Sequence, residues 1–248
     1  MPATLTSIAE RYHAVLERIT RAAQRAGRDP REVRLVVVTK AQPLERVQAV
    51  LEAGARDLGE NYPEEAVPKI QALRPSFPDA RWHMIGHLQR RKAPLVVEHF
   101  AMMHSVDRVR IAERLDRLCA ARDRTLPVLL EFNVGGEASK SGWPAWDEAQ
   151  WPTLLPEIER VLALPRLQVQ GLMTVPPWRP DPEDVRPFFQ RLRRLRDFLA
   201  RAFPRSSWEH LSMGMSHDFE VAIEEGATFV RIGTAILGPR PTPAPGAR

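Results

Sequence analysis

The chain has 248 residues, of which 44% are hydrophobic and 27% charged, with a formal net charge of +5 and a single cysteine, Cys119. One cysteine excludes an internal disulfide and is typical of a reducing compartment. No apolar run approaches the roughly 20 residues that a membrane span needs, and the first residues lead into a polar amphipathic segment rather than a signal peptide. We therefore expect a cytoplasmic protein without a membrane partner.

The apolar pattern predicts helices and strands that alternate along the chain. An amphipathic helix over 4–27, ended by Gly27, comes first. Strands are then predicted at 34–39, 57–59, 82–86, 101–105, 127–132, 167–173, 208–212 and 229–233. Helices are predicted over 43–54, from after Tyr62 to about residue 73, near 91–98, over 107–122, within 147–163, over 186–201 and at about 217–225. After the last strand we expect only a short proline-rich tail.

This alternation favours an α/β fold, a single (β/α)8 TIM barrel with an extra N-terminal helix. An open doubly wound sheet is the alternative. We expect one domain over residues 1–240, followed by a disordered tail at 241–248. The basic residues are interleaved with acids, and no basic block carries stacking aromatic residues, so we expect no nucleic-acid partner.

Polar residues collect at the predicted carboxyl ends of the strands, where TIM barrels place their active sites. They follow seven of the eight predicted strands, at Thr39–Lys40, Glu60–Tyr62, His87–Gln89, His104–Asp107, Asn133–Glu137, Ser212–Ser216 and Arg231–Thr234. The alternative for single residues among them is helix capping, in part for Ser105, Asp107 and Ser216. Polar residues at so many strand ends predict a functional site there.

Lys40 closes the apolar run that begins at Arg34, and it is one of only four lysines among 36 basic residues. An arginine would serve a merely charged surface equally well, whereas a lysine amine can lose its proton and form a Schiff base. The alternative is that Lys40 only marks where the strand reaches water. The other lysines are Lys69 and Lys92, expected at the surface, and Lys140 in a loop.

The last two strand ends have the composition of a phosphate site. Ser212 and Ser216 offer hydroxyl groups, and Gly233–Thr234 offers a hydroxyl and a backbone amide that an anion can approach closely. The alternative is that the glycines only make turns. A Schiff-base lysine opposite a phosphate site predicts pyridoxal phosphate. Arg231 could face the pyridine nitrogen, where its guanidinium only donates and would keep the ring neutral.

Several motifs resemble the pyridoxal phosphate homeostasis protein family, whose fold is similar to the barrel domain of alanine racemase. They are LVVVTK at 35–40, EAGARDLGENYPEE at 52–65, WHMIGHLQRRK at 82–92, HSVD at 104–107, NVGGEASKSGW at 133–143, GLMTVPP at 171–177, and the segment 210–240 with SMGMS and VRIGTAI. Departures include Arg90–Arg91 in place of small polar residues and His217 in place of an acid or amide.

The resemblance implies Lys40 as the Schiff-base lysine and Arg231 at the pyridine nitrogen, with Ser212, Met213, Ser216, Gly233 and Thr234 around the phosphate. It also implies a place near the ring or the barrel mouth for Asn61, His83, Ser105, Asn133 and Met173. We expect no catalytic residues. We also expect no metal site, because His83 and His87 lack the acid or cysteine cluster that zinc requires.

The resemblance further implies a carrier that holds the cofactor on Lys40 and takes part in vitamin B6 homeostasis and delivery to the apo-forms of pyridoxal phosphate enzymes. Amino-acid and keto-acid metabolism would then be affected indirectly. The alternative is a weak amino-acid racemase, which needs a second base. In alanine racemase that base is a tyrosine from a further domain, whereas Tyr12 and Tyr62 are the only tyrosines here. That further domain also builds the racemase dimer, and since we expect none after the last strand, we expect a monomer. A separate hypothesis is that Lys140 takes the cofactor as a second amine during transfer.

Overall fold

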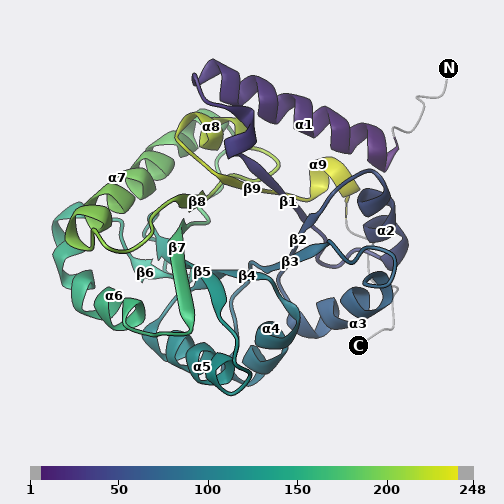
Figure 1. Cartoon of the computed structure of the whole chain (residues 1–248). Helices are drawn as coiled ribbons and strands as arrows, with labels where there is room; N and C mark the ends of the chain where they lie inside the picture. The colour runs from purple at the N-terminus through teal and green to yellow at the C-terminus, as the bar shows by residue number, and fades with distance from the viewer. Residues whose placement is uncertain (1–6, 240–248) are drawn as a thin grey trace.

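Eight parallel strands close into a barrel in this computed structural model, which describes residues 7–239 (Figure 1). Around the ring they are β1 (Arg34–Val38), β2 (Asp57–Glu60), β3 (Arg81–Met84), β4 (Met102–Val106), β5 (Leu126–Asn133), β7 (Leu167–Met173), β8 (His210–Ser212) and β9 (Phe229–Ile232). Pairing of β9 with β1 closes the ring. A two-residue strand, β6 (Trp143–Pro144), pairs with β5 only.

Helices surround the barrel on its outer side (Figure 1). They are α1 (Ile8–Arg25), α2 (Leu44–Glu52), α3 (Pro63–Leu73), α4 (Ala93–His99), α5 (Val109–Ala120), α6 (Leu155–Leu162), α7 (Arg186–Ala202), α8 (Phe219–Glu224) and α9 (Thr234–Leu237). Short 3₁₀ helices are η1 (Pro30–Glu32), η2 (Arg90–Lys92), η3 (Glu148–Leu154) and η4 (Pro182–Val185).

The prediction of a TIM barrel with an extra N-terminal helix is confirmed, but β6 and α9 were not predicted. The expectation that only a tail follows the last strand is therefore wrong for residues 234–237. Both elements are too short to carry a periodic apolar pattern. The boundary of the predicted domain at residue 240 and the tail at 241–248 lie outside the described residues and stay predictions.

The strands are apolar because both of their faces are buried. Val37 belongs to the large core between the strands and the helices, whereas its neighbour Val36 faces the interior of the barrel. The interior cluster also contains Met102, Leu129, Met173 and Phe229. Alternation along each strand therefore divides the side chains between the outer core and the interior.

Helix α1 begins where its sequence provides a cap. The Ser7 hydroxyl accepts from the Glu10 amide, and the Glu10 carboxylate accepts from the Ser7 amide, which is a capping box. The helix ends before Gly27, whose φ of 66° is a left-handed conformation that glycine adopts without strain. Residues 4–6 of the predicted helix lie outside the described residues.

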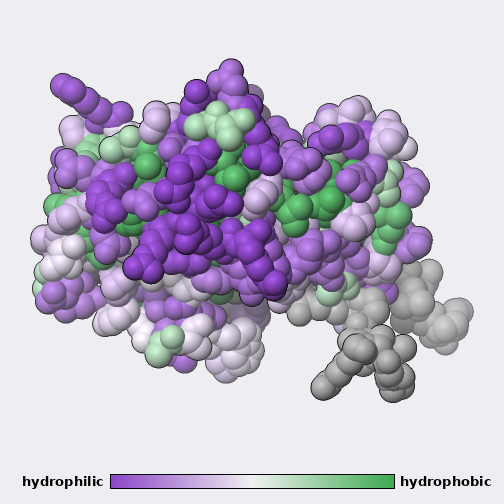
Figure 2. Space-filling model, turned by 90° about the horizontal axis from the view of Figure 1, so that it is seen from below, coloured by the Kyte–Doolittle hydropathy of each residue, from purple (hydrophilic) through white to green (hydrophobic). Residues whose placement is uncertain are grey.

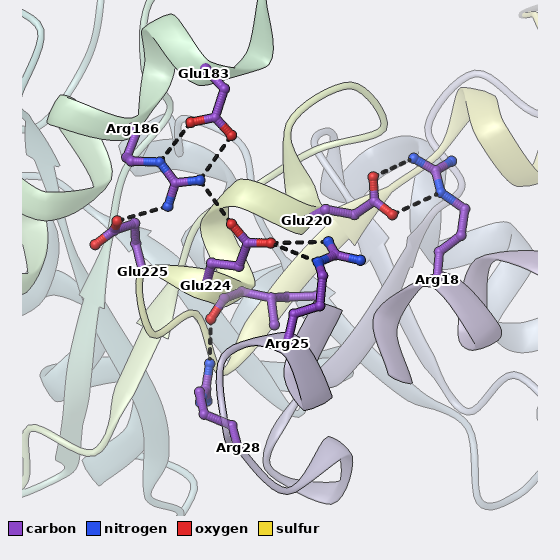
Figure 3. Close-up of polar contacts among 9 residues, drawn as sticks. Arg18, Arg25, Arg28, Glu183, Arg186, Glu220, Glu224 and Glu225 are labelled. Carbon is purple, nitrogen blue, oxygen red and sulfur yellow. Dashed lines mark hydrogen bonds and ion pairs between the residues drawn. The ribbon is translucent and has the colours of Figure 1, made fainter. Parts of the chain in front are cut away.

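A network of ion pairs fastens α1 to α8 (Figure 3). Arg18 binds Glu220 through two nitrogens, and Arg25 binds Glu224 at 2.9 Å. Arg186 from the start of α7 reaches the same Glu224 at 2.8 Å, so that one carboxylate joins three helices. Each partly exposed pair contributes about 0–1 kcal/mol on its own, and a shared carboxylate makes the contacts cooperative.

The outer faces of the helices are polar. Figure 2 shows the side on which α4 and α5 lie in Figure 1. This side is largely hydrophilic, with hydrophobic residues in separate patches. On α5 the buried face includes Cys119, whose thiol pKa is raised by burial, so its predicted role in packing is confirmed. Among residues 7–239 none of the helices combines the length and the apolar composition that crossing a bilayer requires.

Candidate functional site

A cavity of about 370 Å³ lies at the carboxyl ends of β1, β2, β3 and β9 and the loops after β7 and β8. Its lining is Val38, Lys40, Gln42, Asn61, Ile85, Val175, Trp178, Met215, Ser216, His217, Asp218, Arg231, Gly233, Thr234 and Gly238. Small-molecule pockets have volumes of about 300–1,000 Å³ and combine apolar walls with a few polar groups. The cavity has both properties.

Lys40 lies at the corner where the chain leaves β1. The Gln42 amide donates to the Thr39 carbonyl at 3.2 Å, and Ala41 has a φ of 53°, a left-handed conformation that is uncommon for alanine. The chain thus turns sharply directly after Lys40, and strained residues of this kind occur at binding sites. This turn places the half-buried Lys40 on the pocket wall.

A buried ion pair supports this turn from behind. Lys69 on α3 donates to the Glu60 carboxylate at 2.9 Å and to the Thr39 carbonyl at 2.9 Å. The same Glu60 oxygen accepts from the Thr39 hydroxyl at 2.7 Å. The prediction that Lys69 is a surface residue is wrong, because its side chain is only 11% exposed and its amine neutralises a fully buried carboxylate. Burial raises the pKa of Glu60, and Lys69 opposes that rise.

Arg231 enters the pocket from β9. Its side chain is almost fully buried; Nη1 donates to the Ser212 hydroxyl at 2.6 Å and Nη2 to the Thr174 carbonyl at 2.8 Å. Burial lowers the pKa of Arg231 to about 10, a shift that the carboxylates of Glu131 and Asp218 oppose. At neutral pH the guanidinium therefore stays charged and acts only as a donor.

Hydroxyl groups and the start of α9 form another part of the pocket wall. The Ala235 amide in the first turn of α9 donates to the Ser216 hydroxyl at 3.3 Å, which brings the loop after β8 against Gly233–Thr234. Asp218 holds that loop by accepting from the Met215 amide at 2.6 Å. TIM barrels frequently bind phosphate between these two loops and a short extra helix.

His217 tethers the β8 loop to the loop after β7. Its Nε2 donates to the Pro180 carbonyl at 3.0 Å, and its ring stacks on Trp178 with centroids 6.1 Å apart. Trp178 is 69% exposed, so the two rings form part of the rim. The residue that departs from the family pattern therefore joins two loops of the pocket.

Six of the twelve residues predicted for the site line this cavity: Lys40, Asn61, Ser216, Arg231, Gly233 and Thr234. The other six do not line it: His83, Ser105, Asn133, Met173, Ser212 and Met213. Asn133 instead holds the loop after β5 through the amides of Gly135 and Gly136 and the carbonyl of Glu137. Met173 packs in the barrel interior, and Met213 in the outer core.

Ser105 acts one layer behind the pocket. Its hydroxyl donates to the Gly86 carbonyl at 2.6 Å, and a Cβ at Gly86 would lie 2.6 Å from the Asn61 carbonyl oxygen. Glycine is therefore required at 86 for Asn61 to reach the wall of the cavity. Within residues 7–239 the buried Asn61 Oδ1 has no hydrogen-bond partner, so a pocket-lining acceptor remains for a ligand.

Ser212 and His83 belong to a line of buried polar side chains that crosses the barrel interior. Ser212 Oγ lies 2.8 Å from His104 Nδ1, and His104 Nε2 lies 3.0 Å from His83 Nδ1. His83 Nε2 then lies 2.8 Å from Asp57 Oδ1. Alternation along the strands could have placed these residues inside the barrel, but the sequence does not specify their depth.

Across the barrel mouth lies a second group of ionisable residues. Burial and the neighbouring Asp107 raise the pKa of Glu131 to about 7. Lys140, the second predicted amine, lies 4.0 Å from Glu137 and exerts an opposing influence on Glu131. Lys140 does not line the cavity that contains Lys40.

Comparison with known proteins shows what the chain is similar to. Residues 11–241 match the family model described as alanine racemase, N-terminal domain. The pyridoxal phosphate homeostasis protein of Aquifex aeolicus is 44% identical over 232 residues, which cover 93% of this chain and 97% of the relative.

Solved structures agree with this similarity. PipY of Synechococcus elongatus, with PLP bound, has a TM-score of 0.78 and 34% identity, covering 94% of this chain and 100% of that chain. An alanine racemase of Clostridium difficile has a TM-score of 0.66 at 13% identity and is covered over 58% of its length. At that identity the second likeness shows the fold alone.

We predict that Lys69→Met lowers the free energy of unfolding by about 3 kcal/mol, because it leaves the Glu60 carboxylate buried without a cation. The double variant E60Q/K69M should recover much of this loss, since it also removes the buried charge. Lys92→Met is the matched control, because its partner Glu64 is half exposed and the pair contributes about 0–1 kcal/mol. Urea denaturation measures all three, and equal losses in K69M and K92M would contradict the assignment.

We also predict a pH-dependent contribution from Asp57. His83 and Arg81 hold its pKa at about 2 against the opposing effect of burial, below the usual 3.8. The carboxylate therefore stabilises the fold above about pH 4 and loses that effect as the pH falls towards 2. Asp57→Asn should cost on the order of 2 kcal/mol at neutral pH, and the difference from wild type should shrink below about pH 4. Urea denaturation at several pH values checks this, with the exposed Asp123→Asn as control; a pH-independent difference would contradict it.

Proposed function

Since this chain belongs to the pyridoxal phosphate homeostasis protein family, we propose that its pocket binds pyridoxal 5'-phosphate and that the protein takes part in intracellular vitamin B6 homeostasis. The observation that carries the proposal is one cavity lined by the amine of Lys40, the guanidinium of Arg231 and the hydroxyls of Ser216 and Thr234. These groups come from opposite ends of the chain, and closure of the barrel by β1 and β9 brings them together.

The residues present fit this cofactor. When bound, pyridoxal phosphate supplies an aldehyde that reacts reversibly with amines. Lys40 would hold it covalently, and Ser216, Gly233 and Thr234 would hold its phosphate. One observation on the cavity supports the fit: the buried Oδ1 of Asn61 offers an acceptor to a ligand.

Arg231 favours carrying of the cofactor, or racemase-like proton transfer, over transamination. A guanidinium donates hydrogen bonds and gives up no proton at neutral pH, so a ring nitrogen opposite Arg231 stays an unprotonated acceptor. A neutral ring stabilises negative charge poorly. This argues against transamination. We infer a carrier that releases the cofactor to apo-forms of pyridoxal phosphate enzymes and has no robust reaction of its own, and its distinction from a racemase rests on the tyrosines.

A weak amino-acid racemase is the second candidate, because the fold is shared with alanine racemase. A racemase needs proton-transferring groups on both faces of the ring. Tyr12 is buried in α1, and Tyr62, whose side chain is 53% exposed, does not line the cavity. The tyrosines therefore support the carrier. We further propose that the protein is a monomer and that it acts in the cytoplasm. Residues 1–240 would form its one domain.

We predict that the protein turns yellow with added pyridoxal phosphate and that Lys40→Ala loses both the visible absorbance and the adduct fixed by borohydride. The reason is that the imine band, at longer wavelength than the absorption of the free aldehyde, requires the covalent bond to an amine of the protein. Lys92→Ala, which removes a lysine outside the cavity, should keep both. Mass mapping of the reduced protein locates the label: a label at Lys40 alone argues against Lys140 as a second amine. A coloured, reducible Lys40→Ala would contradict the proposal.

We predict no turnover at ordinary enzyme rates when the loaded protein is incubated with a panel of single-enantiomer amino acids. Chiral chromatography measures the opposite enantiomer, and Lys40→Ala serves as the background. Median enzyme turnover is about 10 s⁻¹, so a rate within a few orders of magnitude of that value would sink the carrier and favour the racemase.

A further inference from the structure

The buried polar line through the barrel has a fixed direction at both of its ends. Arg231 can only donate, and it donates to Ser212 Oγ at 2.6 Å. Asp57 is held ionised by Arg81, which contacts both of its oxygens, at 2.8 Å and 2.7 Å, and so it can only accept. With both histidines neutral, every hydrogen in the line then runs from the cofactor pocket towards Asp57.

These ends determine the tautomers of the two histidines between them. His83 Nε2 must carry the hydrogen that Asp57 accepts at 2.8 Å, so the Nδ1 of a neutral His83 is an acceptor. His104 must then donate from Nε2 across 3.0 Å, which leaves its Nδ1 to accept the hydroxyl hydrogen of Ser212 across 2.8 Å. Each of the four contacts then has one donor and one acceptor.

The other arrangement places a proton on His83. His104 would have to accept from His83 and donate to Ser212, which already accepts from Arg231, so the hydroxyl hydrogen of Ser212 would lose its acceptor. His104 is fully buried, and burial with the neighbouring His83, Arg231 and His210 lowers its pKa well below the usual value. The Phe229 ring packs against His83, His104 and His210 and keeps the surroundings apolar.

We propose that His104 and His83 are positioning residues for Arg231, acting through a one-way hydrogen-bond chain from Arg231 through Ser212 to Asp57. Because the Ser212 hydrogen is committed to His104, only its lone pairs face the guanidinium. Arg231 then faces two acceptors, Ser212 Oγ and the Thr174 carbonyl, which fix its orientation at the pocket. The consequence for the cofactor rests on the function proposed above.

The tautomers can be measured without any cofactor. Long-range ¹⁵N–¹H spectra of the wild-type protein near neutral pH should show neutral His83 and His104, each with its hydrogen on Nε2. A hydrogen on Nδ1 of either ring, or a doubly protonated ring, overturns the chain. This readout requires no substitution, so it also stands if a variant does not fold.

Two variants separate positioning from packing. His104→Gln keeps one acceptor for Ser212 and one donor for His83, whereas His104→Leu keeps neither. In the protein without cofactor, the Arg231 Nη hydrogens should give separate resonances in wild type and H104Q and averaged ones in H104L. Affinity for pyridoxal phosphate should fall about tenfold in H104L, the equivalent of one lost hydrogen bond, and largely persist in H104Q.

The outcomes separate this proposal from the function on which it rests. Wild type that binds no pyridoxal phosphate refutes the proposed function, while the tautomers and the Arg231 resonances still test the chain. Wild type that binds the cofactor while H104L retains both its affinity and the separate resonances overturns the chain alone. Equal losses in H104Q and H104L overturn it as well, because a retained donor and acceptor should preserve the direction.

Discussion

Pairing of the last strand with the first is the constraint on which the candidate site depends. In the register between β1 and β9, Val36 lies opposite Arg231 and Val37 opposite Ile232. Because side chains alternate across a strand, a slip of one residue would turn Arg231 out of the barrel. The register is held from both sides, since Val36 packs in the interior cluster and Val37 and Ile232 in the outer core. Ordinary hydrophobic packing thus brings the amine of Lys40 and the guanidinium of Arg231, which are 231 − 40 = 191 positions apart in sequence, to one cavity.

A guanidinium inside a barrel creates a second requirement, because a buried charge is costly unless its hydrogen bonds are made. Ser212 and the Thr174 carbonyl meet part of it. The Ser212 hydroxyl then needs an acceptor for its own hydrogen, which is His104. His104 in turn donates to His83, and His83 donates to Asp57. The Arg81 side chain that pairs with Asp57 is 54% exposed, so the line ends where a charge can be solvated. The polar interior is therefore a consequence of placing Arg231 at the pocket.

Much of this architecture could be predicted from local sequence, and the exceptions have physical reasons. Alternation of strands and helices predicts the barrel, and the scarcity of lysine predicts a chemical function for the Lys40 amine. The surroundings of Lys69 could not be predicted, because a single lysine on a helix carries no sign of the buried Glu60 that it neutralises. Strand pattern can assign a residue to the interior but gives no depth. The sequence therefore cannot tell that Ser212 and His83 lie in the buried polar line and not on the cavity wall.

The extra helix α1 supports the site although it lies outside the barrel. Short helices are marginal by themselves, and α8 and α9 have six and four residues. Helix α1 binds both: Arg18 pairs with Glu220 on α8, and Arg11 Nε donates to the Ile236 carbonyl on α9 at 2.6 Å. The Ser216 hydroxyl reaches the first turn of α9 from the loop that precedes α8, so the two helices and that loop form one unit. The turn at Lys40 is thus supported by the Lys69–Glu60 ion pair, and the loop and short helices that complete the same cavity are supported by α1.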